Sequence, residues 1–451
     1  MTAQLASLAA ALPSAVALPG DENWGQARAA WNLAVEQRPV AVVYPASAED
    51  VVATVQFAAE HGLRIAFNGG GHNAAPIDWS EDTLLLKTER MRAIEIDPAA
   101  RRARVEAGTL AKALSVAAGE HGLAFLAGTS PDAGVVGYLL GGGYSWMIRK
   151  YGLACNSILA VELVTADGRL IRADRESEPD LFWALRGGGG NFGAVTAIEL
   201  ELFPVAEIYA GCLFWPIDRA AEILNFWREW IETLPVECHS IGRMLQFPDL
   251  DFLPEHLRGR SFVLVEAAFI GEESDGAALL QPLRDLAPEI DTVAVIPSSE
   301  ISLVNMDPDF PLPYTGDGIL LHEFTAAAVD AMVERFVGSP LAHVEFRHLG
   351  GAAGTSSPEH GALSCVEQAF LAFTFGMAPD AAAHRAAAEH VEYLLAGLAP
   401  CDSGFRYLNF AESKADPQTL FPAASYERLR EVKARYDPTR MFQANHPIPS
   451  V

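Results

Sequence analysis

The sequence predicts an α+β protein of two or three domains. The chain has 451 residues, and a typical domain contains roughly 100–200 residues. Hydrophobic residues make up 50% and charged residues 20%, so large apolar cores can form. Strand and turn signals dominate the first 205 residues, whereas amphipathic helices become frequent after about residue 214. We therefore expect one domain over 1–205, a second over 206–405 and a separate C-terminal segment over 406–451.

The first elements predict a strand, a helix and a second strand. Residues 40–45 are an apolar, β-rich run that ends in proline. Ser47 is the expected helix N-cap, with Asp50 three residues later, and Gly62 is expected to end the helix. The apolar run 63–67 then predicts a strand that leads directly into a glycine loop.

The remaining elements follow from the same signals, although they are shorter. Asp167-Gly168 lies between two alternating runs and predicts a hairpin. Further strands are expected at 83–88, 92–97, 102–108, 194–202 and 261–271, and helices at 109–122, 179–185, 220–235, 276–286, 380–398 and from about 425 to the Asp437-Pro438 stop. A proline-rich loop is expected over 306–318.

Charge and cysteine usage exclude several classes of function. The formal net charge is −26, so the field of the protein repels nucleic acid and anionic membrane surfaces. The five scattered cysteines form no C-x-x-C pair, which argues against a disulfide framework or a zinc site. No Lys or Arg precedes Arg28, so we expect no signal peptide, and no long uncharged apolar run suggests a membrane span.

Three glycine clusters carry the strongest functional signal. They lie at 69–71, 141–143 and 187–190, with further glycines at 128, 134 and 137. Glycine lets a ligand approach the backbone closely, and successive backbone N–H groups form concave anion sites. Together the clusters favour a long nucleotide-type cofactor with a diphosphate, although tight turns between packed strands are the simpler alternative.

The pattern Gly188-x-Gly190-x-x-Gly193 matches the dinucleotide fingerprint, but its context is wrong. That fingerprint requires a strand before it and a helix after it. Here an expected helix precedes the pattern and an expected strand follows it. We therefore expect no Rossmann domain, and no P-loop motif is present either.

Four motifs in this order identify a family resemblance: NGGGHN, AGTSPDAGVVGYLLGGG, RKYGLACNSILAVELVTADG and DLFWALRGGGGNFGAVT. The chain resembles the FAD-linked oxidases of the berberine-bridge-enzyme-like group, in the vanillyl-alcohol-oxidase superfamily. The resemblance is strong over 38–205 and 405–448. It implies a PCMH-type FAD-binding domain of two subdomains, a substrate (cap) domain with an antiparallel sheet covered by helices, and a C-terminal tail that returns to the FAD-binding domain.

The resemblance also implies a set of cofactor contacts. His72 falls on the histidine that bonds covalently to the flavin 8-methyl carbon in many members; close non-covalent contact and no flavin role are the alternatives. Ser130 stands where bicovalent members have cysteine, which excludes a second, cysteinyl link, and Asn68 stands where many members have arginine. The implied FAD-binding residues are Asn68, Gly69, Gly70, Gly71, His72, Asn73, Gly128, Thr129, Ser130, Gly134, Val135, Gly137, Gly141, Gly142, Asn156, Ile158, Gly193, Val195, Tyr407 and Asn409.

Three residues are candidates for catalysis. Tyr407, in the YLNF motif, matches a tyrosine that assists deprotonation in the family, and packing between domains is its alternative. Gln368 falls on the family's catalytic strand when 359–370 is taken as that strand, and an ordinary strand residue is its alternative. Tyr138 lies in the stretch that wraps the flavin, and helix packing is its alternative. No metal site is expected, since His343 and His348 are five apart and would lie on opposite faces of a strand. Arg347 between them is expected either to orient a carbonyl or anionic group or to form a surface ion pair.

The resemblance implies an FAD-dependent oxidoreductase. We expect an O₂-using oxidase that transfers hydride from an alcohol or amine carbon of a small organic metabolite to the flavin. The alternatives are an NADPH-reduced flavoprotein and a non-catalytic protein that sequesters a drug-like aromatic compound. The acidic composition and the family context suit a cytoplasmic bacterial enzyme whose partners are a small-molecule substrate and O₂, with no nucleic acid and no membrane.

Overall fold

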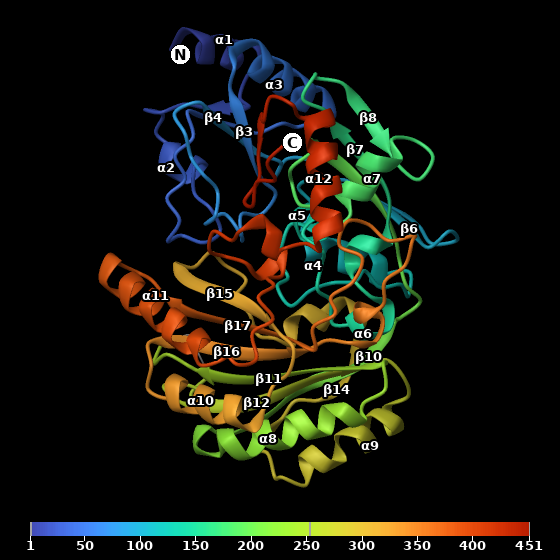
Figure 1. The fold of residues 1–451 in the computed structure, drawn as a ribbon, viewed down its shortest axis with the longest axis vertical. Helices are drawn as coiled ribbons and strands as arrows, with labels where there is room; N and C mark the ends of the chain where they lie inside the picture. The colour runs from blue at the N-terminus through green and yellow to red at the C-terminus, as the bar shows by residue number, and fades with distance from the viewer. Residues whose placement is uncertain (1, 252–253, 451) are drawn as a thin grey trace.

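The computed structural model describes residues 2–251 and 254–450, and over these residues three sheets carry the fold. Two five-stranded sheets lie in the upper half of Figure 1, and an eight-stranded sheet lies in the lower half. No helix among the described residues is long and apolar enough to cross a membrane.

The first sheet is mostly parallel and holds the strand that leads to His72. Its order is β1-β2-β4-β3-β18, and only the β1–β2 pair is antiparallel. Residues 41–43 and 84–86 are fully buried, as expected for parallel strands covered on both faces. Ser47 accepts from the Asp50 N–H and Gly62 has a φ of 66°, so both predicted ends of the helix are confirmed. The elements are α1 (Thr2–Ala11), β1 (Val16–Ala17), α2 (Trp24–Ala27), β2 (Ala41–Val43), α3 (Ala48–His61), β3 (Arg64–Asn68), β4 (Thr83–Lys87) and β18 (Phe442–Gln443).

The second sheet is antiparallel, with the order β5-β6-β9-β7-β8. Strands β7 and β8 form the hairpin predicted at Asp167-Gly168, where Gly168 has a φ of 78°. Helix α7 precedes the 188–193 glycines and strand β9 follows them, which confirms the expected non-Rossmann context. The elements are β5 (Ile94–Asp97), β6 (Arg102–Glu106), α4 (Ala111–Gly119), α5 (Val135–Leu140), α6 (Ile148–Tyr151), β7 (Ile158–Val164), β8 (Leu170–Ala173), α7 (Pro179–Leu185) and β9 (Ala194–Glu201).

The third sheet confirms the expected antiparallel sheet covered by helices. Its order is β13-β10-β12-β11-β16-β17-β15, with β14 also paired to β10. Helices α8 to α11 pack on one face, where Trp215, Trp227 and Phe336 are fully buried. The elements are β10 (Glu207–Pro216), α8 (Ala220–Trp230), β11 (Cys238–Gln246), β12 (Ser261–Phe269), α9 (Glu273–Arg284), β13 (Ile290–Asp291), β14 (Ala294–Pro297), β15 (Tyr314–Leu321), α10 (Ala326–Phe336), β16 (Leu341–His348), β17 (Phe370–Met377) and α11 (Ala381–Ala396).

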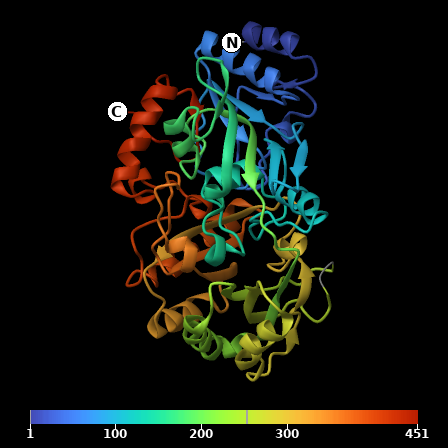
Figure 2. The same ribbon diagram turned by 90° about the vertical axis from the view of Figure 1, so that its right-hand side faces the viewer.

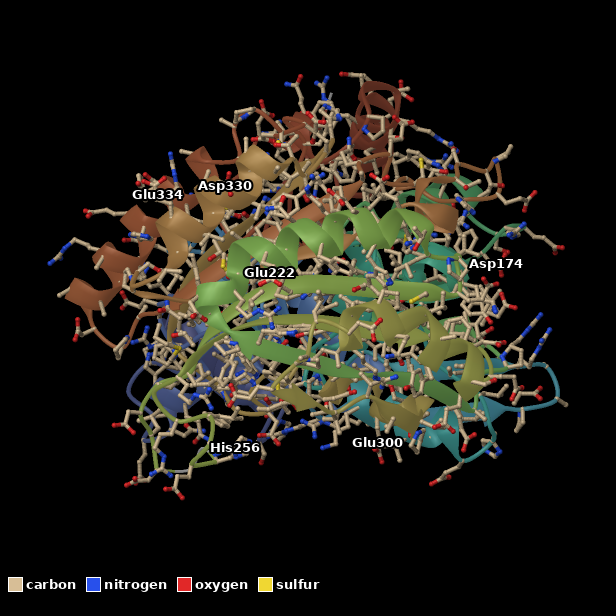
Figure 3. The ribbon with its side chains drawn as sticks, turned by 90° about the horizontal axis from the view of Figure 1, so that it is seen from below. Asp174, Glu222, His256, Glu300, Asp330 and Glu334 are labelled. Atoms are coloured by element: carbon tan, nitrogen blue, oxygen red, sulfur yellow. The ribbon has the colours of Figure 1, made fainter. Side chains whose placement is uncertain are left out.

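The helix layer faces solvent with acidic side chains. Figure 3 shows the molecule from the side of this layer, with Glu222 on α8 and Asp330 and Glu334 on α10 labelled. All three residues are exposed. The opposite face of the sheet is directed toward the glycine loops of the N-terminal half, and it forms one wall of the cavity described below.

The C-terminal segment returns to the first sheet. Helix α12 (Ala423–Tyr436) packs against α7 along the outside of the N-terminal half, and β18 then pairs in parallel with β3 (Figure 2). The buried Lys433 ammonium holds this return in place: it donates to the carbonyl oxygens of Asn191 and Phe442 and to the Asp437 carboxylate. The helix ends before Asp437, as the Asp437-Pro438 pair predicts.

Candidate active site

A cavity of about 360 Å³ lies between the glycine loops and the eight-stranded sheet. One wall comes from the end of β3, the loops at 69–74, 128–137 and 189–193, and residues 443–445. The other wall comes from β16, β17, the segment 305–314 and residues 408–412. The two halves of the chain therefore meet at this cavity.

The glycines of the first wall let the loops approach each other more closely than side chains allow. A Cβ atom on Gly134 would lie 2.6 Å from the carbonyl oxygen of Gly69, and one on Gly70 would lie 3.0 Å from the Gly134 nitrogen. Gly71 has a φ of 85°, a conformation that residues with side chains rarely adopt. A Cβ on Gly137, by contrast, would meet nothing within 4 Å, since this residue faces the cavity. The wall is thus a surface of bare backbone.

His72 presents one imidazole from this wall. Its ring stacks on Trp31 with 4.2 Å between ring centroids and 19° between planes, and its Nε2 lies 3.2 Å from the Ser130 hydroxyl. Its Nδ1 is buried and finds no hydrogen-bond partner among the described residues. Burial lowers the pKa of His72 to about 4, so the imidazole is neutral at neutral pH. A neutral imidazole with one free nitrogen is a nucleophile in the correct state for alkylation.

Strand β16 supplies an ion pair to the opposite wall. Glu345 and Arg347 lie two residues apart on one face of the strand and are almost fully buried. The Arg347 guanidinium donates through Nε (2.8 Å) and Nη2 (2.6 Å) to Glu345 Oε1, and through Nη2 to the Thr129 hydroxyl (3.2 Å). It also lies over the rings of Tyr144 and Phe410. The ion pair of Arg347 is therefore buried and not on the surface, and its expected role in orienting a carbonyl or anionic group stays a prediction.

Three polar atoms of β16 remain without a hydrogen-bond partner in the part of the chain that the structure describes: Glu345 Oε2, Arg347 Nη1 and His343 Nε2. Buried polar groups are normally satisfied, so an unsatisfied cluster beside a cavity indicates a ligand site. His343 is held through its Nδ1, which lies 3.3 Å from Nη2 of the buried Arg243. His343 faces the cavity while His348 contacts Arg149, which confirms that the two histidines lie on opposite faces.

Two further carboxyl groups line the cavity. Burial raises the pKa of Glu412 to about 8, and burial raises that of Asp307 to about 6. Tyr314 donates to Glu412 Oε1 (3.0 Å) and to the main-chain oxygen of His72 (3.4 Å). Asn305 donates to Asp307 (2.7 Å). Several titratable groups with perturbed pKa values in one cavity are typical of an active site.

Most of the predicted FAD-binding residues come together in this cavity. The sequence-predicted residues that line it are Asn68, Gly69, Gly70, Gly71, His72, Asn73, Gly128, Thr129, Ser130, Gly134, Gly137, Gly141, Gly193, Val195 and Asn409. Asn409 also fixes the wall itself, since its Oδ1 accepts from the Gly143 N–H and its Nδ2 donates to the Tyr138 carbonyl.

Five predicted residues lie outside the lining: Val135, Gly142, Asn156, Ile158 and Tyr407. Asn156 instead ties down the loop at 361–364, where it donates to the Ser364 carbonyl and accepts from the Gly361 N–H. Tyr407 is buried in the core against Gly142, where a Cβ would lie 2.8 Å from its hydroxyl. Burial raises the pKa of Tyr407 well above its usual value, and its buried hydroxyl has no hydrogen-bond partner among the described residues.

The other two catalytic candidates occupy different positions. Tyr138 lines the cavity, but its hydroxyl donates to the main-chain oxygens of Leu126 and Tyr144. The expected strand position of Gln368 is wrong: this residue lies in the loop before β17, which begins at Phe370. Residues 359–369 form no strand, and the strand that carries charged residues to the cavity is β16. Catalytic roles for Tyr407, Gln368 and Tyr138 stay predictions.

Sequence reasoning missed much of the second wall. The signal was present in HVEFRH (343–348), where alternate positions place His343, Glu345 and Arg347 on one face of a strand. No local pattern identifies the other contributors, because they come from distant segments. Those residues are Trp31, Tyr144, Asn305, Asp307, Tyr314, Phe373, Phe375, Phe410 and Glu412.

Comparison with known proteins agrees with this architecture. Residues 39–174 match the family model described as FAD binding domain, and residues 406–449 match the one described as Berberine and berberine like. The chain is 28% identical to (R)-6-hydroxynicotine oxidase of Paenarthrobacter nicotinovorans, covering 96% of both chains. It is 26% identical to glucooligosaccharide oxidase of Sarocladium strictum, covering 93% of this chain and 89% of the relative.

The chain is an FAD-linked oxidoreductase, and FAD-linked oxidases of the berberine-bridge-enzyme-like group are its homologues. Solved structures of the group share the fold. The crystal structure of 6-hydroxy-D-nicotine oxidase from Arthrobacter nicotinovorans superposes with a TM-score of 0.84 at 26% identity, over 95% of this chain and 96% of that one. The berberine-bridge-enzyme-like protein 1 of Physcomitrella patens has a TM-score of 0.87 at 21% identity, over 99% of both chains.

The residues of this oxidoreductase fit its FAD cofactor. The bare glycine wall leaves room for a diphosphate beside backbone N–H groups, and His72 presents a free, buried Nδ1 at the same wall. The residues of the first wall would therefore hold FAD.

Proposed function

We propose that this oxidoreductase is an O₂-using oxidase that removes hydride from an alcohol or amine carbon of a small organic metabolite. The observation that carries the proposal is a set of buried polar atoms on β16 that have no hydrogen-bond partner among the described residues, Glu345 Oε2, Arg347 Nη1 and His343 Nε2; all three residues line the cavity opposite the glycine wall. FAD, when bound, supplies the hydride acceptor and returns the electrons to O₂.

Two side chains of β16 have separate roles in the proposed reaction, one in accepting the proton and one in orienting the substrate. Hydride removal from an alcohol or amine leaves a proton on the substrate oxygen or nitrogen, and this proton needs an acceptor. We assign that role to Glu345, which lines the cavity and whose buried Oε2 has no hydrogen-bond partner among the described residues. Arg347, fixed by Glu345 and Thr129 and packed on two aromatic rings, offers Nη1 to a substrate oxygen. The pair therefore orients the substrate and accepts its proton.

We also propose that His72 carries a single covalent bond to FAD through Nδ1. In the net reaction a C–N bond replaces one C–H bond of the flavin 8-methyl group and the imidazole N–H. The two hydrogens leave with two electrons to O₂, which is reduced to H₂O₂. The neutral imidazole, the free Nδ1 and the absence of cysteine at Ser130 support one bond and only one.

Two measurements test these proposals. In a panel of small alcohols and amines, at least one compound should reduce the flavin anaerobically, and air should reoxidise it with release of H₂O₂. Reduced flavin that persists for minutes in air would overturn the oxidase assignment, and rapid bleaching by NADPH alone would indicate a reductase instead. Acid precipitation should leave the yellow colour in the pellet of wild type, and His72→Ala should move it to the supernatant.

A further inference from the structure

The imidazole of His72 is fixed on two sides, by the Trp31 ring and by the Ser130 hydroxyl. Trp31 covers one face, with 4.2 Å between ring centroids and 19° between planes. The Ser130 hydroxyl meets Nε2 at 3.2 Å. An unrestrained histidine on a glycine-rich loop samples several rotamers, and a stack combined with an edge contact selects one. Under these two contacts Nδ1 is the nitrogen left free.

Trp31 is itself held by the opposite half of the molecule. The adjacent Asn32 is buried, its Nδ2 donates to the Tyr314 carbonyl (3.0 Å), and its Oδ1 accepts from the Tyr314 N–H (3.2 Å). The Leu33 N–H donates to the carbonyl of Leu312 (3.0 Å). We call residues 31–33 the strap. It follows α2 and joins the segment that leads into β15, so it crosses from the N-terminal half to the eight-stranded sheet (Figure 1).

The strap, His72 and the second wall thus form one continuous set of contacts. The Trp31 ring meets the Tyr314 ring edge-on at 6.3 Å, and the Tyr314 hydroxyl donates to the main-chain oxygen of His72. The main chain of Trp31 also lies close to Gly71, where a Cβ would be 3.0 Å from the Trp31 nitrogen. Displacement of the eight-stranded sheet would therefore move both Trp31 and the loop that bears His72.

We propose that Trp31 is a positioning residue that sets the His72 imidazole for bonding to FAD, and that the strap makes this bonding depend on docking of the eight-stranded sheet. This inference rests on the proposed histidyl bond. It predicts that loss of the Trp31 ring slows attachment while leaving FAD binding in place, because Trp31 packs on the histidine and the glycine wall itself is unchanged.

The test compares Trp31→Ala, Trp31→Phe and the control Trp183→Ala, which removes an equally half-buried tryptophan far from the cavity. The readouts are total flavin per polypeptide and the fraction that stays with the acid-precipitated protein, sampled over time after induction. We expect attachment to be about tenfold slower in Trp31→Ala, near wild type in Trp31→Phe and unchanged in Trp183→Ala, with total flavin similar in all.

Asn32→Ala tests the strap separately, because it removes both bonds to Tyr314 and leaves the Trp31 side chain intact. We expect slower attachment here too, by a smaller factor. Wild-type attachment rates in Trp31→Ala would overturn the positioning role, and a wild-type rate in Asn32→Ala would overturn its dependence on docking. Flavin that leaves wild type in acid would instead overturn the histidyl bond itself, so the two failures are distinguishable.

Discussion

The two walls of the active-site cavity differ in composition, since one exposes much glycine backbone and the other exposes charged and aromatic side chains. The first wall, which we call the FAD wall, contains glycines whose backbones approach closely, so that a Cβ on Gly134 would lie 2.6 Å from a main-chain oxygen. The wall formed by the eight-stranded sheet consists of charged and aromatic side chains, among them Glu345, Arg347 and Phe375. A backbone surface binds a ligand through N–H and C=O groups that do not depend on the side chain, whereas a side-chain surface can change without altering the fold.

This difference explains how relatives on one fold can bear the names of different substrates. The chain is similar both to a 6-hydroxynicotine oxidase and to a glucooligosaccharide oxidase. Gly70 and Gly134 tolerate few substitutions, because a Cβ on either would lie 3.0 Å or less from a backbone atom. Strands β16 and β17 keep their register through main-chain hydrogen bonds, so their cavity-facing side chains are free to vary. If the two walls are independent, substitutions in one should leave the function of the other intact.

The largest effect is expected at Glu345. Glu345→Gln keeps an oxygen for Arg347 but removes the proton acceptor, so kcat/KM should fall by roughly 10²–10⁴-fold while flavin content stays at the wild-type level. Stopped-flow reduction of the flavin and steady-state O₂ uptake measure this change. Glu334→Gln, on the exposed face of α10, is the matched control and should behave as wild type. Unchanged flavin reduction in Glu345→Gln would exclude Glu345 as proton acceptor.

At Gly134 we expect weaker flavin binding, in contrast to the loss of turnover with unchanged flavin content at Glu345. Gly134→Val forces atoms against the main chain of Gly69, and overpacking of this kind costs about 1–3 kcal/mol, so flavin binding should weaken by up to about a hundredfold. The ratio of flavin to protein absorbance after purification measures it. Gly25→Ala is the control, since a Cβ there meets nothing within 4 Å. Full flavin content with altered substrate preference would contradict the independence of the two walls.

A smaller effect is expected at Arg347. Arg347→Lys keeps the charge but loses the planar fork that contacts both Glu345 and Thr129, so KM should rise by about tenfold and the flavin content should not change. Substrate saturation curves measure this, with the exposed Arg385→Lys as control. A fall in flavin content would show that Arg347 serves the FAD wall through Thr129.

The smallest effect is expected in the pH dependence of folding stability, through Glu412. Glu412 holds its proton up to about pH 8 in the folded protein, against a value near 4.5 when unfolded, so the folded state binds more protons between these values. The Glu412 contribution to stability is therefore present at low pH and is lost as pH rises through this window. Glu412→Gln should lose less stability on alkalinisation than wild type. Thermal unfolding midpoints across the window measure this difference, and Glu334→Gln should follow the wild-type curve.

The sequence predicted the FAD wall better than the opposite wall for a physical reason. Backbone recognition leaves a local trace: glycines must follow one another in the chain, as at 69–71, and caps such as Ser47 with Asp50 act within three residues. The second wall gathers single side chains from β16, β17 and the segment 305–314, so no short window contains it. The alternation in 343–348 is the local signal for this wall, because it places His343, Glu345 and Arg347 on one face of a strand. Tyr407 shows that a sequence motif does not fix burial, since its side chain is buried outside the cavity lining, and its catalytic role stays a prediction.

The pairing of β18 with β3 sets an order of events during biosynthesis. Strand β3 carries the loop of His72, but its neighbour in the sheet is made of residues 442–443, and residues 443–445 line the cavity beside the glycines. A ribosome that has released only the first half of the chain therefore presents an unfinished cofactor site with one open sheet edge. The wall that includes residues 443–445 is therefore complete only after translation has passed residue 445.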